Sequence, residues 1–236
     1  MRKIMIYLLG IMILALGFLL VSASAKAADY VPERAKLYMP VLKTEIVNNW
    51  PSLKPRSLLA AQIEQETCAS LKTKKCWNPN TELKTEREYG FGLGQITITK
   101  RFNVFEETRL MDKSLADWKW EDRFNPAYQI RAIVVKMRNT VIQTSKLTPN
   151  PEDRLAFALS AYNGGLGGVL KDRTLCANTK GCDPKRWFGH VENTSYKSRV
   201  AVHGYGQSFF DVNRGYVRNV LPELPRRKKY IPYMDS

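Results

Sequence analysis

Residues 55–68 read PRSLLAAQIEQETC, and their apolar positions recur with the period of an amphipathic helix. Leu59, Ile63 and Glu66 are spaced i, i+4 and i+7, so they lie within about 60° of one another around the helix. The Glu66 carboxylate therefore shares the apolar stripe, whereas Glu64 is expected in solvent. Partly apolar surroundings disfavour the charged form of a carboxyl group and raise its pKa towards that of a general acid. The alternative is that Glu66 pairs with a lysine or arginine at the edge of the core.

A second predicted helix, over residues 152–163, repeats this geometry, because Leu155, Leu159 and Tyr162 have the same spacing. Tyr162 then faces inward at the helix end, where its hydroxyl could bond a buried carboxyl group. Asn163 offers a donor and an acceptor that suit an amide or a sugar hydroxyl. A packed tyrosine and a C-capping asparagine would explain the two residues without a ligand.

Glycines mark two further segments. Residues 164–168 read GGLGG, which ends the preceding helix, because glycine readily adopts positive φ. Residues 89–95 read YGFGLGQ, and their alternating glycines let the backbone approach a ligand closely. Phe91 offers a flat apolar face there and Gln95 a bidentate polar tip. Neither G-x-G-x-x-G nor a G-K-[ST] ending is present, so a phosphate-binding loop is not predicted.

The chain of 236 residues is 44% hydrophobic and 25% charged, which suits one well-packed domain. Further helices are predicted over 41–50 and 126–144, the second opened by Asn125-Pro126 as N-cap and first residue. Short extended pieces are predicted over 95–99 and 200–202. Helical periodicity dominates, so the sequence predicts a mainly α single domain.

The N-terminus has the pattern of an export signal. Arg2 and Lys3 precede an uncharged stretch over 4–21, and residues 22–27, which read SASAKA, follow with the small residues of a cleavage site. A cleaved signal peptide or a retained hydrophobic signal helix is expected over 1–27, and the latter would attach the protein to the inner membrane. The remaining chain is therefore expected to be exported, either periplasmic or secreted.

Charge indicates the kind of partner. The chain has 37 Lys+Arg against 22 Asp+Glu, a net charge of +15, which favours a polyanion. Export makes nucleic acid a poor candidate, so an anionic cell-envelope surface is expected. The main domain is assigned to 28–225, and residues 226–236, which begin with the basic run RRKK, are expected to form a solvated basic and polar tail.

The cysteines form two close pairs, Cys68 with Cys76 and Cys176 with Cys182. In an exported chain they favour disulfides, and the sequential pairing closes the shortest loops among three connectivities. Neither the cysteines nor the two histidines have the spacing of metal ligands, so no metal is predicted.

Taken in order, these fragments resemble the catalytic domain of the soluble lytic transglycosylases, which is related to goose-type lysozymes. The matching segments are Glu66-Thr67 for the family's Glu-Ser, Gly92-Leu93-Gly94-Gln95 for Gly-Leu-Met-Gln, and Ala161-Tyr162-Asn163-Gly164-Gly165 for Ala-Tyr-Asn-Ala-Gly. Residues 125–130 resemble the start of a structural helix in the family, and residues 213–221 resemble its last motif. The resemblance spans roughly residues 55–221.

The resemblance implies a lysozyme-like domain with short β pieces beside an active-site cleft, and no cofactor. It implies cleavage of the β-1,4 bond between N-acetylmuramic acid and N-acetylglucosamine in peptidoglycan glycan strands, with a 1,6-anhydro product. Glu66 would act as both acid and base. Tyr162 would orient it, and the other expected substrate-site residues are Thr67, Phe91, Gln95, Asn163 and Tyr216, the last of which would pack against or shape the groove.

The sequence departs from the family pattern in several places. Val212 stands where an acidic residue usually opens the last motif, and Gly94 replaces the usual methionine. The segment between Glu66 and Gln95 is longer than in the family and contains the first cysteine pair, which suggests a clipped loop beside the cleft.

Three other functions are compatible with the sequence. A hydrolytic muramidase of the same architecture would need a carboxylate to hold water, and Glu86, Glu88 and Asp117 are candidates that are more typical of surface charges. A non-catalytic wall-binding or lysis-accessory protein, or a cationic membrane-disrupting protein, would also suit the charge. The sequence does not distinguish wall turnover, envelope-machine assembly and phage lysis.

Overall fold

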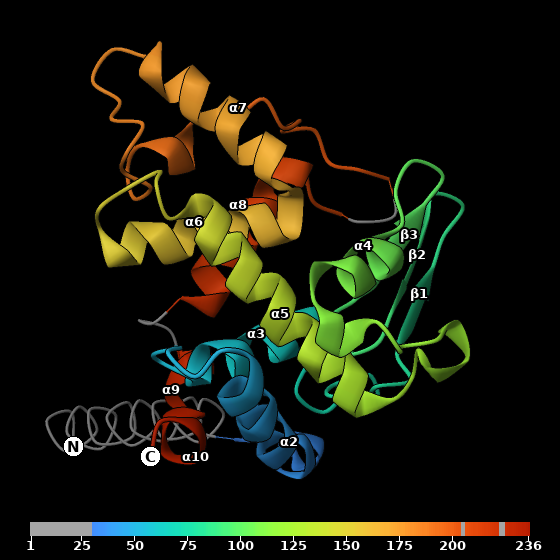
Figure 1. Ribbon diagram of the computed structural model, residues 1–236. Helices are drawn as coiled ribbons and strands as arrows, with labels where there is room; N and C mark the ends of the chain where they lie inside the picture. Colours follow the sequence, from blue (N-terminus) through green and yellow to red (C-terminus); the bar gives the residue numbers. More distant parts are fainter. Residues whose placement is uncertain (1–29, 204–205, 222–224) are drawn as a thin grey trace, which may run out of the picture.

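The computed structural model describes residues 30–203, 206–221 and 225–236 (Figure 1). The expected signal segment, 1–27, lies outside them. The helices are α2 (Glu33–Asn49), α3 (Ser57–Thr67), α4 (Val104–Met111), α5 (Pro126–Thr144), α6 (Pro151–Gly164), α7 (Leu166–Ala177), α8 (Phe209–Val220), α9 (Pro225–Lys228) and α10 (Ile231–Met234). Short 3-10 helices cover Lys113–Leu115, Trp120–Asp122 and Val191–Asn193. Within the described residues, no helix is long and apolar enough to span a membrane.

A small antiparallel sheet accompanies the helices in the part of the chain that the structure describes. Its strands, β1 (Glu82–Lys84), β2 (Glu88–Phe91) and β3 (Ile96–Thr99), pair in chain order. Phe91 lies opposite Glu82 in one pair and opposite Ile96 in the other. This mainly helical architecture with a small sheet confirms the predicted fold class.

Helix α5 separates two hydrophobic clusters. Asn125 caps it by accepting a hydrogen bond from the Ala127 N–H, as the sequence predicted. Residues Ile130, Ile133, Val134 and Met137 join the main core, which also receives the buried faces of α2, α3, α6 and α8. Ala132 and Val135 join a second cluster beneath the sheet and α4. Figure 1 shows α5 running from the sheet side of the molecule towards α6.

Several boundaries differ from the sequence prediction. Helix α2 begins at Glu33, ahead of the helix predicted over 41–50, and continues through Pro40. The chain ends α6 at Gly165, whose φ is 80°, and then resumes a helix at Leu166. Helix α7 was missed because its glycines read as a turn. The segment predicted to be extended over 200–202 contributes one β-bridge, between Ala201 and Ser208.

The C-terminal segment is packed, so the prediction of a solvated tail over 226–236 is wrong. Tyr230 and Met234 are fully buried, and Lys229 is 7% exposed. Helices α9 and α10 lie against α3 and α2 (Figure 1). The basic run suggested exposure to solvent. Part of it is instead buried against acidic and aromatic side chains that are distant in the sequence.

Both cysteine pairs are disulfide-bonded in the predicted sequential order, Cys68 with Cys76 and Cys176 with Cys182. The first closes a loop directly after α3, and the second closes a loop directly after α7.

Candidate active site

Glu66 lies in the last turn of α3, on the stripe that buries Leu59 and Ile63. Its side chain is half-buried. Desolvation by the surrounding side chains raises the pKa of Glu66 from 4.5 to about 7, against the lowering effects of a hydrogen bond from Tyr216 and the charge of Lys136. Helical spacing predicted that Glu66 lies on the apolar stripe of α3. In this position its carboxyl group is partly protonated near neutral pH.

The direct partner of Glu66 comes from α8. The Tyr216 hydroxyl donates to Glu66 Oε1 over 2.7 Å, and Tyr216 is 3% exposed. Among the described residues this bond is made by Tyr216 and not by Tyr162, to which the sequence had assigned the orienting contact. Tyr162 instead stacks on Tyr216, with ring centroids 6.3 Å apart and planes 14° apart. Helical periodicity could place each tyrosine on an inner face. It does not predict which one contacts Glu66, because the approach of α8 to α3 is a long-range contact.

Lys136 of α5 brings a positive charge to this group. Its Nζ lies 3.9 Å from the centroid of the Tyr162 ring. Burial lowers the pKa of Lys136, and the charge of Glu66 acts in the opposite direction. The sequence had left open a basic partner for Glu66 without naming it. The signal was available: Lys136 follows Ile133 by three residues, at the edge of the apolar face of α5.

The glycine-rich turn between β2 and β3 reaches Tyr162. Gly92 has φ of 74°, and a Cβ on it would lie 2.5 Å from the side chain of Gln129. That buried side chain accepts from the Leu93 N–H over 2.9 Å and donates to two carbonyl oxygens, which fixes the turn. A Cβ on Gly94 would lie 2.8 Å from Ile133 and 3.4 Å from the Tyr162 hydroxyl. This contact explains why glycine occupies a position at which the related motif carries methionine.

Gln95 is half-buried at the end of this turn, with φ of 43°. Its Nε2 donates to the Gly92 carbonyl oxygen over 2.9 Å. The polar tip is thus held within the turn, and the Gly94 contact places the turn beside Tyr162.

Two expected substrate contacts are buried structural residues. Phe91 is fully buried among Phe105, Trp118 and other aromatic side chains, so the expectation of a ligand-facing ring is wrong. Thr67, which is 4% exposed, donates to the Ile63 carbonyl and accepts from the Trp77 N–H. It therefore secures the last turn of α3, which carries Glu66, to the segment that follows Cys76.

Glu64 occupies the other side of α3 and is 1% exposed, so its predicted solvation is wrong. It forms ion pairs with Lys229 at 2.7 Å and Arg226 at 3.1 Å, and accepts from the Tyr230 hydroxyl over 2.5 Å. The α3 helix is consequently buried on both sides, with one carboxyl group paired structurally and the other beside two tyrosines.

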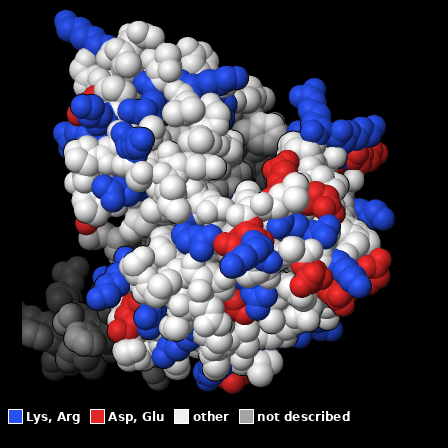
Figure 2. Space-filling view, in the orientation of Figure 1, with Lys and Arg blue, Asp and Glu red and all other residues white. Residues whose placement is uncertain are grey.

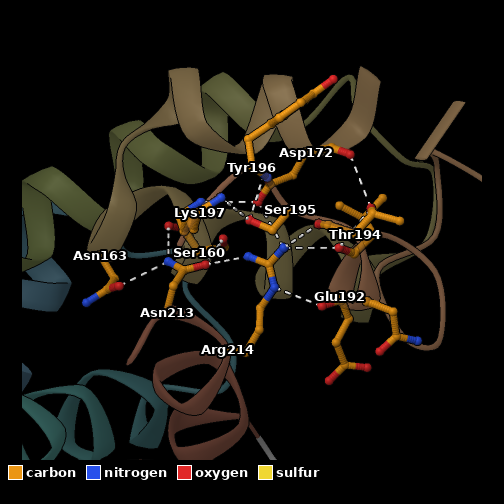
Figure 3. A network of polar contacts seen from close by, with 12 residues as sticks. Ser160, Asn163, Asp172, Glu192, Thr194, Ser195, Tyr196, Lys197, Asn213 and Arg214 are labelled. Carbon is orange, nitrogen blue, oxygen red and sulfur yellow. Dashed lines mark hydrogen bonds and ion pairs between the residues drawn. The ribbon is translucent and has the colours of Figure 1, made fainter. Parts of the chain in front are cut away.

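Asn163 is exposed at the end of α6, next to Tyr162. Its Oδ1 accepts from Asn213 Nδ2 over 3.0 Å, at the border of a network of polar contacts (Figure 3). The residues predicted from the sequence that cluster here are thus Glu66, Tyr162, Tyr216, Gln95 and Asn163.

The surface carries an uneven charge. On the face shown in Figure 2, lysine and arginine side chains predominate near α6 and α7, whereas basic and acidic side chains both occur around the sheet. The surface is hollowed between these two parts (Figure 2). Of the three candidates for a second carboxylate that would hold water, Glu86 and Asp117 are exposed and Glu88 is half-buried.

Comparison with known proteins gives a distant match. The chain is 29% identical over 102 residues to the membrane-bound lytic murein transglycosylase F of Vibrio parahaemolyticus. The aligned region covers 42% of this chain and 19% of that protein, so the chain spans about a fifth of its relative. No family model matches the sequence.

Chemically, the cluster offers one carboxyl group that can exchange a proton near neutrality, held by a phenol and influenced by an ammonium group. An exposed amide lies at its border. Such a group can protonate a leaving oxygen and then accept a proton from a nucleophile.

Proposed function

We propose that the protein is a peptidoglycan lytic transglycosylase that uses Glu66 as its single acid and base. The observation that carries this proposal is the partly desolvated carboxyl group of Glu66, with a pKa of about 7 and a hydrogen bond from Tyr216. The distant similarity to a lytic murein transglycosylase supports the same reaction class.

The reaction would begin with protonated Glu66 donating its proton to the oxygen that bridges the two sugars. The bond between that oxygen and the anomeric carbon of N-acetylmuramic acid breaks, and the acetamido group of the same sugar stabilises the positive anomeric centre. The Glu66 carboxylate then takes the proton of the C6 hydroxyl, and the C6 oxygen bonds to the anomeric carbon. The 1,6-anhydro sugar leaves, and Glu66 is protonated again. Substrate assistance explains how one carboxyl group suffices.

The neighbouring residues divide the remaining work. Tyr216 holds the carboxyl group, and Tyr162 supports the ring of Tyr216. Gln95 and Asn163 are proposed to contact sugar amides or hydroxyls. The net charge of +15 would draw the protein to an anionic wall, an attraction that weakens as salt rises. We place this activity outside the cytoplasm, on peptidoglycan of the envelope.

Clearing of purified sacculi by the wild-type protein and by Glu66→Gln tests the proposal. Losing a general acid is expected to reduce the rate on the order of a hundredfold to ten-thousandfold. Equal clearing by both proteins would remove Glu66 from the mechanism. Mass spectrometry of the products then identifies the reaction, since products heavier by one water molecule than the anhydro form would show a hydrolase.

A further inference from the structure

A buried guanidinium group lies behind the exposed amide of Asn163. Arg214 of α8 is 3% exposed, and its Nη2 donates to Asp172 Oδ2 over 2.9 Å and to the Thr194 carbonyl over 2.8 Å. Its Nε donates to the Glu192 carbonyl over 2.9 Å. These bonds fix the guanidinium plane between α7 and α8 (Figure 3).

The fixed guanidinium determines how Asn213 points its amide. Arg214 Nη1 lies 2.6 Å from Asn213 Oδ1, and because a guanidinium only donates, the facing atom has to be the oxygen. On the other side, Asn213 Nδ2 donates to the Ser160 carbonyl over 3.0 Å, and a carbonyl only accepts. The two contacts assign the same orientation independently.

The second hydrogen on Asn213 Nδ2 then reaches Asn163 Oδ1 over 3.0 Å. The oxygen of Asn163 is therefore turned inward, and Figure 3 shows its nitrogen pointing away from the network. Gly164 makes room for this contact, because a Cβ there would lie 2.8 Å from Asn213 Nδ2.

From this relay we infer that Asn213, held by Arg214, is a positioning residue that makes Asn163 a hydrogen-bond donor for a carbonyl oxygen of the substrate. The inference rests on the proposed function, in which the acetamido groups of the glycan supply that oxygen. The inference assigns Asn163 the role of donor, whereas an asparagine side chain can in general donate or accept a hydrogen bond.

Side-chain amide exchange measured by NMR on the full chain, labelled with ¹⁵N-asparagine, tests the orientation without substrate. The Asn163 NH₂ should exchange rapidly and the Asn213 NH₂ slowly. In Asn213→Asp, the atom facing Asn163 becomes an acceptor, so the Asn163 amide should turn over and its NH₂ should become protected. Equal exchange of the Asn163 NH₂ in the wild type and the variant would overturn the relay.

Binding of N-acetylglucosamine oligomers, measured with Glu66→Gln as the parent, tests the ligand. Both Asn163→Ala and Asn163→Asp should weaken binding about three- to tenfold, the usual effect of one neutral hydrogen bond. Asn163 is exposed, and Asn163→Asp keeps an acceptor for Asn213 Nδ2, so this variant is expected to fold as the parent does. Asn178→Asp makes the same substitution at another exposed position and should leave binding unchanged.

The outcomes separate the two proposals. If Asn163→Asp binds as well as the parent, the amide acts as an acceptor and the inference fails while the proposed function stands. If no variant or parent binds glycan, the ligand assignment fails together with the proposed function, and the exchange experiment still judges the orientation.

Discussion

The hydroxyl of Tyr216 donates a 2.7 Å hydrogen bond to Oε1 of Glu66, which joins residues 150 positions apart in the chain. A donor favours the ionised carboxylate, whereas desolvation disfavours it. The result of the opposing effects is a pKa of about 7 for Glu66, so that about half of the molecules carry the proton near neutral pH.

Replacing Tyr216 with phenylalanine should raise the pKa of Glu66 and reduce turnover, because the donor and the constraint on the carboxyl group are both lost. A bond to a charged group is typically worth about 1.5–3 kcal/mol, which corresponds to a rate loss of roughly ten- to a hundredfold. Sacculus clearing measured from pH 5 to 9 reports both effects. Tyr162→Phe is the matched control, since it removes a phenol hydroxyl that makes no bond to Glu66 in the described structure. A larger effect from Tyr162→Phe would contradict the assignment of Tyr216.

Lys136→Met should also raise the pKa of Glu66, because the ammonium group lowers it. The alkaline limb of the pH profile, where activity falls as Glu66 loses its proton, should move to higher pH. Lys146→Met removes the same charge at an exposed position and should not move this limb. If the two variants give the same profile, Lys136 does not act on Glu66.

The inward placement of Glu66 and Tyr162 could be predicted from the sequence because the periodicity of a single helix is a local property. The sequence assigned the contact with Glu66 to the wrong tyrosine because the packing of α8 on α3 is not encoded within either segment. Glu64 shows the same limit. Its side of α3 was expected in solvent, but the last residues of the chain cover it.

Glycines predicted a break in the helix correctly where the backbone has a positive φ. Where the backbone is helical or extended, the predictions made from glycines were wrong. Gly165 does end α6, yet the next glycines lie inside α7. In the segment 89–95, the alternating glycines suggested a ligand loop throughout. Phe91 instead belongs to a strand and a buried aromatic cluster, because its ring is surrounded by side chains from α4 and the 113–124 segment.

The burial of Tyr230 predicts a stability effect distinct from activity. Its hydroxyl accepts from Trp77 Nε1 over 3.0 Å and donates to Glu64, so Tyr230→Phe leaves a buried indole N–H without its partner. The free energy of unfolding should fall by about 1–3 kcal/mol. Urea denaturation measures this change, with Tyr233→Phe, at an exposed position, as the control. A loss no greater than that of the control would show that the C-terminal segment does not secure α3.

Although Glu66→Gln should lose activity, its free energy of unfolding should increasingly exceed that of the wild type as pH rises. Below pH 4.5 the carboxyl group is protonated in both folded and unfolded chains, so it contributes no difference. Between pH 4.5 and about 7 the unfolded chain releases the proton while the folded protein retains it, and the free energy of unfolding of the wild type therefore falls. Above this range both states are ionised, and the accumulated loss reaches about 3 kcal/mol. Glutamine has no proton to release, so the stability advantage of the variant should grow across this window and then level off.

Urea denaturation from pH 4 to 8 measures this stability difference, with Glu86→Gln as an exposed control. A constant difference between wild type and Glu66→Gln would mean that the carboxyl group is not desolvated, which would remove the physical basis for its role as an acid.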